Sequence, residues 1–407
     1  MADGPMTDAV ERRDLVNDGP PGQTVELTVV IPCLNEADTI AICVTKALRG
    51  IADAGVTGEV VVADNGSTDG SQAIVESLGG RVVPVPERGY GAALMGGIAA
   101  ARGRWILMGD GDDSYDFLEI PRFVKHLQQG YELVQGCRLP AGGGNVKPGA
   151  MPFLHRWVGN PGFSFLARLM FNCKVNDVHC GMRAFSREAH ERLGQRCTGM
   201  EFATEMLIKS SLNGLKTAEV PITLHPDGRT SHGPHLRTFR DGWRHLRLYL
   251  LFSPRWLYLL PGLLLSLLGL VGYVLSMPRM TVFGATLDLQ TLLVSSMLIL
   301  VGAQLILFAL ATRVFAVYSH MLPDDPKLDR FFTLFTLEKG VLASAAVGLL
   351  GMALLGSVIW EWSSIDFGPL DASRTMRAVI PAVTLITLSV QGVFSSFFIS
   401  MLGMRHK

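Results

Sequence analysis

Residues 27–36 read Leu-Thr-Val-Val-Ile-Pro-Cys-Leu-Asn-Glu, so an apolar, β-branched run leads directly into a polar turn. The pattern recurs at 59–69 as Glu-Val-Val-Val-Ala-Asp-Asn-Gly-Ser-Thr-Asp, and at 104–116 as Arg-Trp-Ile-Leu-Met-Gly-Asp-Gly-Asp-Asp-Ser-Tyr-Asp. A short apolar run bounded by turn residues is typical of a strand buried on both faces. We therefore predict three strands, each ending in a cluster of polar side chains.

Helical patterns alternate with these strands. A further strand is predicted over residues 81–85, and helices over residues 38–48, 71–78 and 91–101. Alternation of strands and helices implies parallel pairing with right-handed crossovers, hence a Rossmann-like, doubly wound α/β sheet. Ligands bind such sheets where the strands end, so we expect the three polar clusters to meet at one edge.

The carboxylates of residues 110–116 carry the strongest chemical signal. Acidic side chains this close repel one another, and proteins keep them together mainly where a divalent cation or a proton transfer uses the charge. The alternative is an acidic turn that caps the next helix. The same alternative applies to Ser67, Thr68 and Asp69, which are good caps.

Composition excludes several classes of protein. The 36 basic and 36 acidic residues give a formal net charge of zero, so nucleic acid is not expected as a partner. All six cysteines precede residue 200 without a CxxC pair, which predicts reduced, cytosolic thiols. His179 and Cys180, near Cys173, lack a full set of zinc ligands. Residues 1–24 have no signal-peptide core and are predicted to be a disordered tail.

Membrane segments dominate the last third of the chain. Four stretches without charged residues, at about 256–277, 289–312, 341–360 and 378–404, are long enough to cross the roughly 30 Å hydrocarbon core. We therefore predict an α/β domain over residues 25–235, an interfacial segment over 236–255, and an all-α transmembrane domain of four helices over 256–407. Gln304 and Gln391 lie inside spans and are expected to bond across helices.

An amphipathic helix is predicted directly before the first span. Apolar residues recur at spacings of three and four beside a basic stripe, namely Leu236, Phe239, Trp243, Leu246 and Leu250 beside Arg237, Arg240, Arg244 and Arg247. This pattern indicates a helix in the plane of the membrane interface. Residues 153–171 fit either a membrane surface or an ordinary core helix. The glycine-rich residues 141–149 are predicted to be a mobile loop beside the site.

Loop charges predict the orientation. Basic residues precede the first span, occupy the middle loop and end the chain, with Arg405 and Lys407 last. Arg279, Arg374 and Arg377 in the other loops are a mild counter-signal. The bias places the α/β domain in the cytoplasm, and we expect a bacterial plasma-membrane protein.

Six motifs resemble the family 2 glycosyltransferases of the glycosyltransferase A fold, in the polyprenyl-phosphate group that contains dolichol-phosphate mannose and glucose synthases. They are residues 30–36 (Val-Ile-Pro-Cys-Leu-Asn-Glu), 63–70 (Ala-Asp-Asn-Gly-Ser-Thr-Asp-Gly), 88–93 (Arg-Gly-Tyr-Gly-Ala-Ala), 109–114 (Gly-Asp-Gly-Asp-Asp-Ser), 135–138 (Gln-Gly-Cys-Arg) and 177–183 (Asp-Val-His-Cys-Gly-Met-Arg). The resemblance covers about residues 25–255.

Position by position, the resemblance implies roles for ten residues. The nucleotide-sugar would be held by Pro32, Asn35, Glu36, Asp64, Asn65 and Asp110, with Arg229 on the diphosphate side. Asp110 and Asp112 would bind Mg²⁺ or Mn²⁺, and Arg138 and Arg183 would grip the acceptor phosphate, which suits the planar guanidinium. The chain departs from relatives at Asn65 in place of Asp, at Ser114 in place of Gln, and at His232 in place of Lys.

The implied reaction transfers a hexose from a UDP- or GDP-sugar to a polyprenyl phosphate by an inverting, metal-assisted single displacement. A phosphomonoester has a second pKa near 6, so at pH 7 the acceptor attacks without a general base. The expected partners are the sugar donor, the lipid acceptor and the membrane. Whether the last two spans form a homo-oligomer, shelter lipid or move product is left open.

Two other functions compete with this one. A processive polysaccharide synthase would share the nucleotide half and the spans, but its relatives carry a Gln-x-x-Arg-Trp segment that this chain lacks. A non-catalytic membrane scaffold that binds nucleotide would have little need for two acidic clusters and three arginines. Turnover of donor on addition of lipid phosphate separates the enzyme from the scaffold.

Overall fold

The computed structural model describes residues 24–230, 238–319 and 321–404. Contacts divide the chain into two units, described separately below. The N-terminal unit comprises Met1–Phe165, Lys174–Ser210 and Gly214–Arg237, and the C-terminal unit comprises Leu166–Cys173, Ser211–Asn213 and Thr238–Lys407. Several predictions concern residues outside the described ranges, namely the tail up to residue 23, His232, Leu236, Arg237, Arg405 and Lys407.

A seven-stranded sheet forms the centre of the N-terminal unit, in the order β3-β2-β1-β4-β7-β5-β8. The strands are β1 (Leu27–Cys33), β2 (Gly58–Asp64), β3 (Arg81–Pro84), β4 (Trp105–Met108), β5 (Leu133–Cys137), β7 (Arg183–Ser186) and β8 (Thr217–Pro221). Strand β7 runs antiparallel to both β4 and β5, whereas the other neighbours pair in parallel. The predicted mostly parallel α/β sheet is confirmed.

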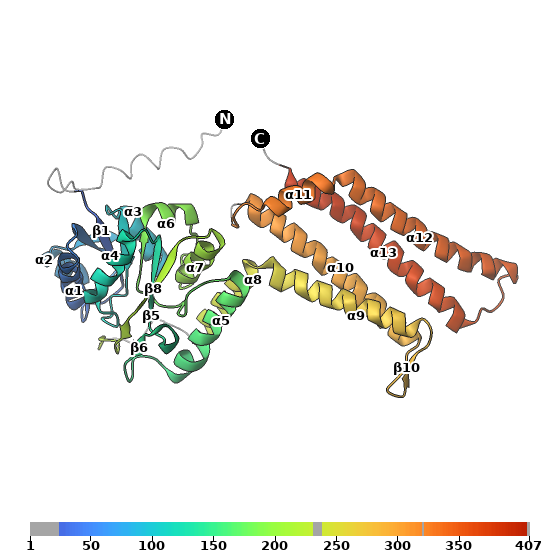
Figure 1. Cartoon of the computed structure of the whole chain (residues 1–407), viewed down its shortest axis with the longest axis horizontal. Coiled ribbons are helices and arrows are strands. Elements are labelled where there is room, and N and C mark those ends of the chain that lie inside the picture. The colour runs from blue at the N-terminus through green and yellow to red at the C-terminus, as the bar shows by residue number, and fades with distance from the viewer. Residues whose placement is uncertain (1–23, 231–237, 320, 405–407) are drawn as a thin grey trace. The chain divides into compact units, whose positions relative to one another are not determined.

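Helices cover both faces of this sheet (Figure 1). They are α1 (Ile40–Asp53), α2 (Ser71–Ser77), α3 (Tyr90–Ala100), α4 (Ile120–Gln128), α6 (Arg187–Leu193) and α7 (Phe202–Leu212). Helix α5 (Asn160–Phe171) is divided between the two units at residue 166. Successive strand residues point to opposite faces. Val29 joins the buried cluster that contains Ile40 of α1, whereas a Cβ at Gly97 of α3 would lie 2.5 Å from Val30. The glycine therefore lets α3 lie close against β1.

The glycine-rich segment 141–149, predicted as a mobile loop beside the site, contains short pieces of regular structure, and its mobility stays a prediction. A short 3₁₀ turn (Pro140–Gly142) leads into β6 (Asn145–Val146), which pairs in parallel with β9 (Thr223–Leu224). A Cβ at Gly144 would lie 2.2 Å from the carbonyl oxygen of Cys137. Glycine is needed there for close approach of two backbones, a tertiary requirement that composition does not reveal.

Four helices of the C-terminal unit are long and apolar enough to cross a membrane, as predicted. They are the segment Arg255–Ser276, which contains α9 (Leu260–Ser276), then α10 (Leu289–Tyr318), α12 (Leu337–Ser364) and α13 (Ala372–Gly403). Figure 1 shows them side by side, with α10 packed against both α9 and α13, and α12 against α13. The short strands β10 (Thr281–Val282) and β11 (Ala285–Thr286) form a hairpin between α9 and α10.

Polar side chains join these helices. The hydroxyl of Tyr273 lies 2.6 Å from Ser296 Oγ and 3.1 Å from Thr384 Oγ1, which links α9, α10 and α13. Arg377 pairs with Asp288 and donates to the carbonyl oxygen of Ser276 at the end of α9. Arg377, one of the three arginines that count against the predicted orientation, is therefore neutralised by Asp288 and caps the end of α9.

The predicted amphipathic helix is α8 (Thr238–Leu251), in the C-terminal unit. Its buried residues are Asp241, His245, Leu248 and Tyr249, and Tyr249 stacks on Phe171 with ring centroids 5.6 Å apart. Two residues of the predicted apolar stripe, Phe239 and Trp243, are 85% and 59% exposed, whereas Leu246 and Leu250 are half-buried. In the N-terminal unit, Phe153 and Trp157 are also exposed, at 77% and 56%, which opposes the core-helix alternative for that face.

Candidate functional site

The three predicted polar clusters meet at the carboxyl ends of β1, β2 and β4. Cys33 at the end of β1 pairs with Asp64 at the end of β2, and Val30 pairs with Met108 at the end of β4. The hydroxyl of Thr39, after the first cluster, donates to the carbonyl oxygen of Gly111 in the third at 2.6 Å. The sheet therefore assembles one site from segments far apart in the sequence.

The first two clusters hold each other in place. Asn35 adopts a φ of 59°, and its Oδ1 accepts from the backbone N–H of Thr68 at 2.8 Å. The N–H of Glu36 donates to Ser71 Oγ at 3.1 Å. Asn tolerates this left-handed conformation better than most residues. Pro32, the preceding site residue, lies within β1 beside Ala63.

Asp64 and Asn65 also organise the backbone. Asp64 accepts from the N–H groups of Gly66 and Ser67. Asn65 donates through Nδ2 to the carbonyl oxygens of Val85 and Glu87, while its Oδ1 accepts from the N–H of Gly89. An ionised Asp has no donor for two carbonyls. The departure from relatives at Asn65 therefore has a structural cause.

Two of the four acidic residues at 110–116 make contacts that support the fold, and the other two lie at the candidate site. Asp113 pairs with Lys46 of α1 at 2.8 Å, and Asp116 accepts from the N–H of Leu118 to cap the next turn. The capping alternative is therefore correct for Asp116. Asp110 and Asp112 instead belong to the site.

Asp110 is held by groups that sequence reasoning did not single out. The hydroxyl of Tyr90 donates to Asp110 Oδ1 at 2.8 Å, and a Cβ at Gly181 would lie 2.7 Å from Oδ2. Removal from water, followed by the charge of Asp112, raises the pKa of Asp110 to about 6, although Tyr90 and two arginines oppose the shift. A raised carboxyl pKa indicates a position where added positive charge is stabilising.

Both oxygens of Asp112 are engaged. Oδ1 accepts from the N–H and the hydroxyl of Ser114 at 3.1 and 2.6 Å, and Oδ2 lies 3.2 Å from Nη2 of Arg229. Arg229 also contacts Glu36 at 3.1 Å and Asp227 at 2.5 Å, with its side chain only 8% exposed. The predicted diphosphate residue thus lies against the predicted nucleotide and metal residues.

The pair Asp110 and Asp112 fits a magnesium-type site by its chemistry. Such a cation keeps several waters and takes one or two protein carboxylates together with substrate phosphates. No group of three or more His, Cys, Asp or Glu residues in the described part of the chain is arranged to hold a metal. A guanidinium already lies against Asp112, so the carboxylate accepts a cation in this position.

Arg138 lies at the end of β5 in a buried network. Its Nε and Nη2 donate to the two oxygens of Asp177 at 2.7 and 2.9 Å, and its Nη1 donates to the hydroxyl of Tyr115 at 3.2 Å. Tyr115 in turn accepts from the N–H of Gly181, beside Asp110. The network fixes the orientation of Arg138 near the acidic edge.

Arg183 is fully buried on β7. Its Nη1 donates to the carbonyl oxygen of Ala203 and its Nη2 to that of Cys180, both at 2.6 Å. These groups lie in the scaffold beneath the edge, and the guanidinium is not exposed to solvent. Its role at the acceptor phosphate stays a prediction.

Sequence reasoning missed Tyr90, Tyr115 and Asp227. Tyr90 stands in the quoted motif at 88–93, and Asp227 stands two residues before Arg229. An aromatic hydroxyl among the carboxylates of a strand-end motif is the signal that would have found Tyr115.

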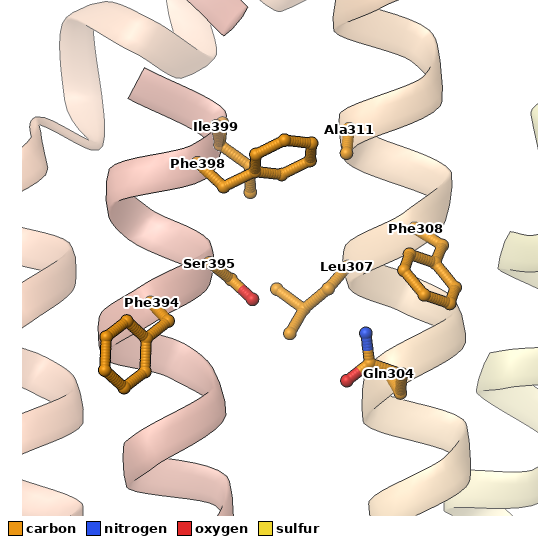
Figure 2. Close-up of a pocket in the computed structure, with 8 residues that line it drawn as sticks. All are labelled: Gln304, Leu307, Phe308, Ala311, Phe394, Ser395, Phe398 and Ile399. Atoms are coloured by element: carbon orange, nitrogen blue, oxygen red, sulfur yellow. The ribbon is translucent and has the colours of Figure 1, made fainter. Parts of the chain in front are cut away.

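The C-terminal unit has a cavity of about 200 Å³ between α10 and α13 (Figure 2). Gln304 and Ser395 are its polar lining residues, and aromatic side chains such as Phe394 and Phe398 surround them. Its lining carries no charged group. None of the predicted site residues lines this cavity.

Comparisons with known proteins cover both units. The model of glycosyl transferase family 2 matches residues 28–194, and that of the glycosyltransferase family 2 C-terminal transmembrane region matches residues 310–403. The low-salt glycan biosynthesis hexosyltransferase Agl6 of Haloferax volcanii is 36% identical over 386 residues, which cover 93% of this chain and 89% of that protein. A dolichyl-phosphate hexose transferase of the same organism is 33% identical, over 48% of this chain and 82% of that protein.

Solved structures match part of the chain. A glucosyl-3-phosphoglycerate synthase from Mycobacterium tuberculosis, in complex with Mn²⁺, uridine diphosphate and phosphoglyceric acid, is 26% identical with a TM-score of 0.44. The match covers 56% of this chain and 78% of that chain.

Proposed function

The chain belongs to glycosyltransferase family 2, and from that premise we propose that it transfers a hexose from a nucleotide-sugar to a polyprenyl phosphate. The observation that carries the proposal is the convergence of Asp110, Asp112 and Arg229 at the edge of a sheet in an integral membrane protein. The similarity to a dolichyl-phosphate hexose transferase supports a lipid phosphate as acceptor.

The donor would be held by the first two clusters. Glu36 and Asp64, with Pro32, Asn35 and Asn65 around them, offer acceptors for the hydroxyls and base edge of a nucleoside. Mg²⁺ or Mn²⁺, held by Asp110 and Asp112, would supply positive charge to the diphosphate leaving group. Arg229 is placed to donate to the same diphosphate, which suits its fork of N–H groups.

The acceptor side would use Arg138, whose orientation is fixed by Asp177. An oxygen of the lipid phosphate attacks the anomeric carbon, the bond from that carbon to the diphosphate oxygen breaks, and the nucleoside diphosphate leaves. The attacking phosphate is largely dianionic at pH 7, so no side chain has to remove a proton. Positioning and fixed charge therefore provide the catalysis, and the anomeric centre inverts.

Membrane attachment fits the acceptor. Exposed Phe239 and Trp243 beside arginines on α8 are suited to the headgroup layer, where a lipid phosphate lies. We propose that the N-terminal unit faces the cytoplasm, because the bias in loop charge points that way.

The direct test incubates full-length protein in detergent with radiolabelled UDP- and GDP-sugars and undecaprenyl phosphate. We expect one labelled glycolipid per donor consumed, formed only when lipid phosphate and Mg²⁺ or Mn²⁺ are both present. Release of free sugar without a glycolipid would contradict the acceptor. A labelled polymer would instead indicate a processive synthase.

A further inference from the structure

We propose that Arg229 is the internal counter-cation of the donor site: in the absence of donor its guanidinium holds Asp112 and Glu36, and a divalent cation must displace it from Asp112. The inference rests on the proposed function, because it assumes that Asp112 is a metal ligand. It adds that metal and nucleotide bind with positive coupling through this one side chain.

Both carboxylate oxygens of Asp112 are already engaged in this structure. Oδ1 accepts two hydrogen bonds from Ser114, and Oδ2 lies 3.2 Å from Nη2 of Arg229. Nη1 of the same guanidinium lies 3.1 Å from Glu36. A metal that binds Oδ2 therefore competes directly with an arginine whose side chain is 8% exposed.

Arg229 is held in this position by its own loop. Asp227 accepts from Nε at 2.9 Å and from Nη2 at 2.5 Å, so the guanidinium cannot rotate freely. The N–H of Gly228 donates to the carbonyl oxygen of Asp112 at 2.9 Å, and Thr230 donates to Asp38 through its N–H and its hydroxyl. The loop thus rests on both the first and the third cluster.

Electrostatics gives the guanidinium two alternative partners. Without donor, its departure would leave Glu36 and Asp112 close together with less compensation, which is unfavourable in a partly buried site. With donor, a diphosphate offers Arg229 charge-assisted hydrogen bonds in place of the lost ones. Metal and nucleotide should therefore favour each other's binding, and linkage requires the effect to be equal in both directions.

Lys46 provides the matched control. Its ammonium group lies 2.8 Å from Asp113, the residue after Asp112. Lys46 and Arg229 therefore each place one positive charge beside the same acidic segment. In the part of the chain that the structure describes, the ammonium group of Lys46 forms ion pairs with Asp113 and Asp116 and none with Asp112. A general change in local charge would act in both variants, whereas displacement from Asp112 concerns Arg229 alone.

The experiment measures Mn²⁺ binding to full-length protein in detergent by the electron paramagnetic resonance signal of free Mn²⁺, without nucleotide and with UDP or GDP. For Arg229→Gln we expect about tenfold tighter Mn²⁺ binding without nucleotide, within the usual range of coupling between sites. The gain in Mn²⁺ affinity on adding nucleotide should shrink relative to wild type. Lys46→Gln should change Mn²⁺ affinity much less.

A second variant guards against a folding defect in the first. Asp227→Asn keeps the guanidinium but weakens its clamp, so Mn²⁺ affinity without nucleotide should lie between wild type and Arg229→Gln. Equal Mn²⁺ affinity in wild type and both loop variants, or an equal gain in Lys46→Gln, would overturn this inference alone. Failure of the wild type to bind Mn²⁺ even with either nucleotide would overturn the proposed metal site as well.

Discussion

The hydroxyl of Tyr90 donates a 2.8 Å hydrogen bond to Oδ1 of Asp110, across the gap between the start of α3 and the end of β4. Two hydrogen bonds hold the start of α3 in place. The N–H of Gly89 donates to Asn65 Oδ1, and the N–H of Ala92 donates to the carbonyl oxygen of Thr198. A Cβ at Gly89 would lie 2.4 Å from the same carbonyl. The phenol therefore reaches Asp110 from a fixed backbone.

Removal of this hydroxyl should slow catalysis. Tyr90→Phe keeps the ring but removes a hydrogen bond to a charged group, which contributes about 1.5–3 kcal/mol, so we expect kcat to fall by roughly 10- to 100-fold. KM for the acceptor should change little. Steady-state kinetics with the lipid acceptor measures both, and an unchanged kcat would show that Asp110 needs no such support.

Asp112 and Asp113 are adjacent, but their substitution should affect kcat to different extents. Asp112→Ala removes an electrostatic stabiliser at the site, and we expect a loss of about 100- to 1,000-fold in kcat. Asp113→Asn removes the charge that pairs with Lys46, keeps a residue that tolerates the φ of 57° at this position, and should retain most activity. Glycolipid formation in saturating Mg²⁺ distinguishes them, and comparable losses in the two variants would argue against a special role for Asp112.

Glu205 should contribute stability that depends on pH. Its Oε1 lies 2.7 Å from Lys209, and its Oε2 accepts from the N–H groups of Arg196 and Cys197. Burial acts to raise the pKa of Glu205, but these hydrogen bonds outweigh it and hold the pKa below the ordinary 4.5. The carboxylate thus stabilises the fold above about pH 4.5, and the contribution is lost as the pH falls through the lowered pKa.

Glu205→Gln tests this contribution. The variant leaves Lys209 buried without its partner charge, and we expect the free energy of unfolding at pH 7 to fall by about 3 kcal/mol. Thermal unfolding in detergent, followed by near-ultraviolet circular dichroism at several pH values, should show the difference narrowing in acid. The exposed Glu191→Gln is the control. A difference that stays constant with pH would exclude the ionised carboxylate as its source.

The orientation can be tested at the β10–β11 hairpin. Phe283 is fully exposed at its tip, and the six native cysteines all precede residue 200, five of them buried. In intact cells, Phe283→Cys should react with a membrane-impermeant maleimide. The exposed Gln128→Cys in α4 should react only after lysis. The reverse pattern would place the N-terminal unit outside the cytoplasm.

Much of the sheet could be predicted because β1, β2 and β4 are short apolar runs that end in polar turns. Strand β3 was also predicted, as residues 81–85, whereas β5 and β7 lack this signal. Strand β5 contains Gln135 and Gly136, and β7 begins with Arg183, so neither reads as an apolar run. Arg183 is tolerated there because carbonyl oxygens of Ala203 and Cys180 accept its hydrogen bonds, a tertiary arrangement that no local pattern reveals.

The site was predictable in outline for a related reason. Parallel strands bring their carboxyl ends to one edge, so the meeting of three clusters followed from the pattern. The different roles of the neighbouring acidic residues did not follow from the pattern. Asp112 and Asp113 are chemically identical, and the structure separates them because Arg229 reaches one and Lys46 the other.

The position of strand β7 in the sheet has a consequence for folding during synthesis of the chain. This strand lies between β4 and β5 in the sheet and pairs with both, yet the ribosome synthesises it after both of them. Until Ser186 leaves the ribosome, β4 and β5 lack this shared neighbour, and unpaired strand edges invite association with other chains. All seven strands of this sheet precede Arg255, so its closure during translation can protect these edges before the first hydrophobic helix reaches the insertion machinery.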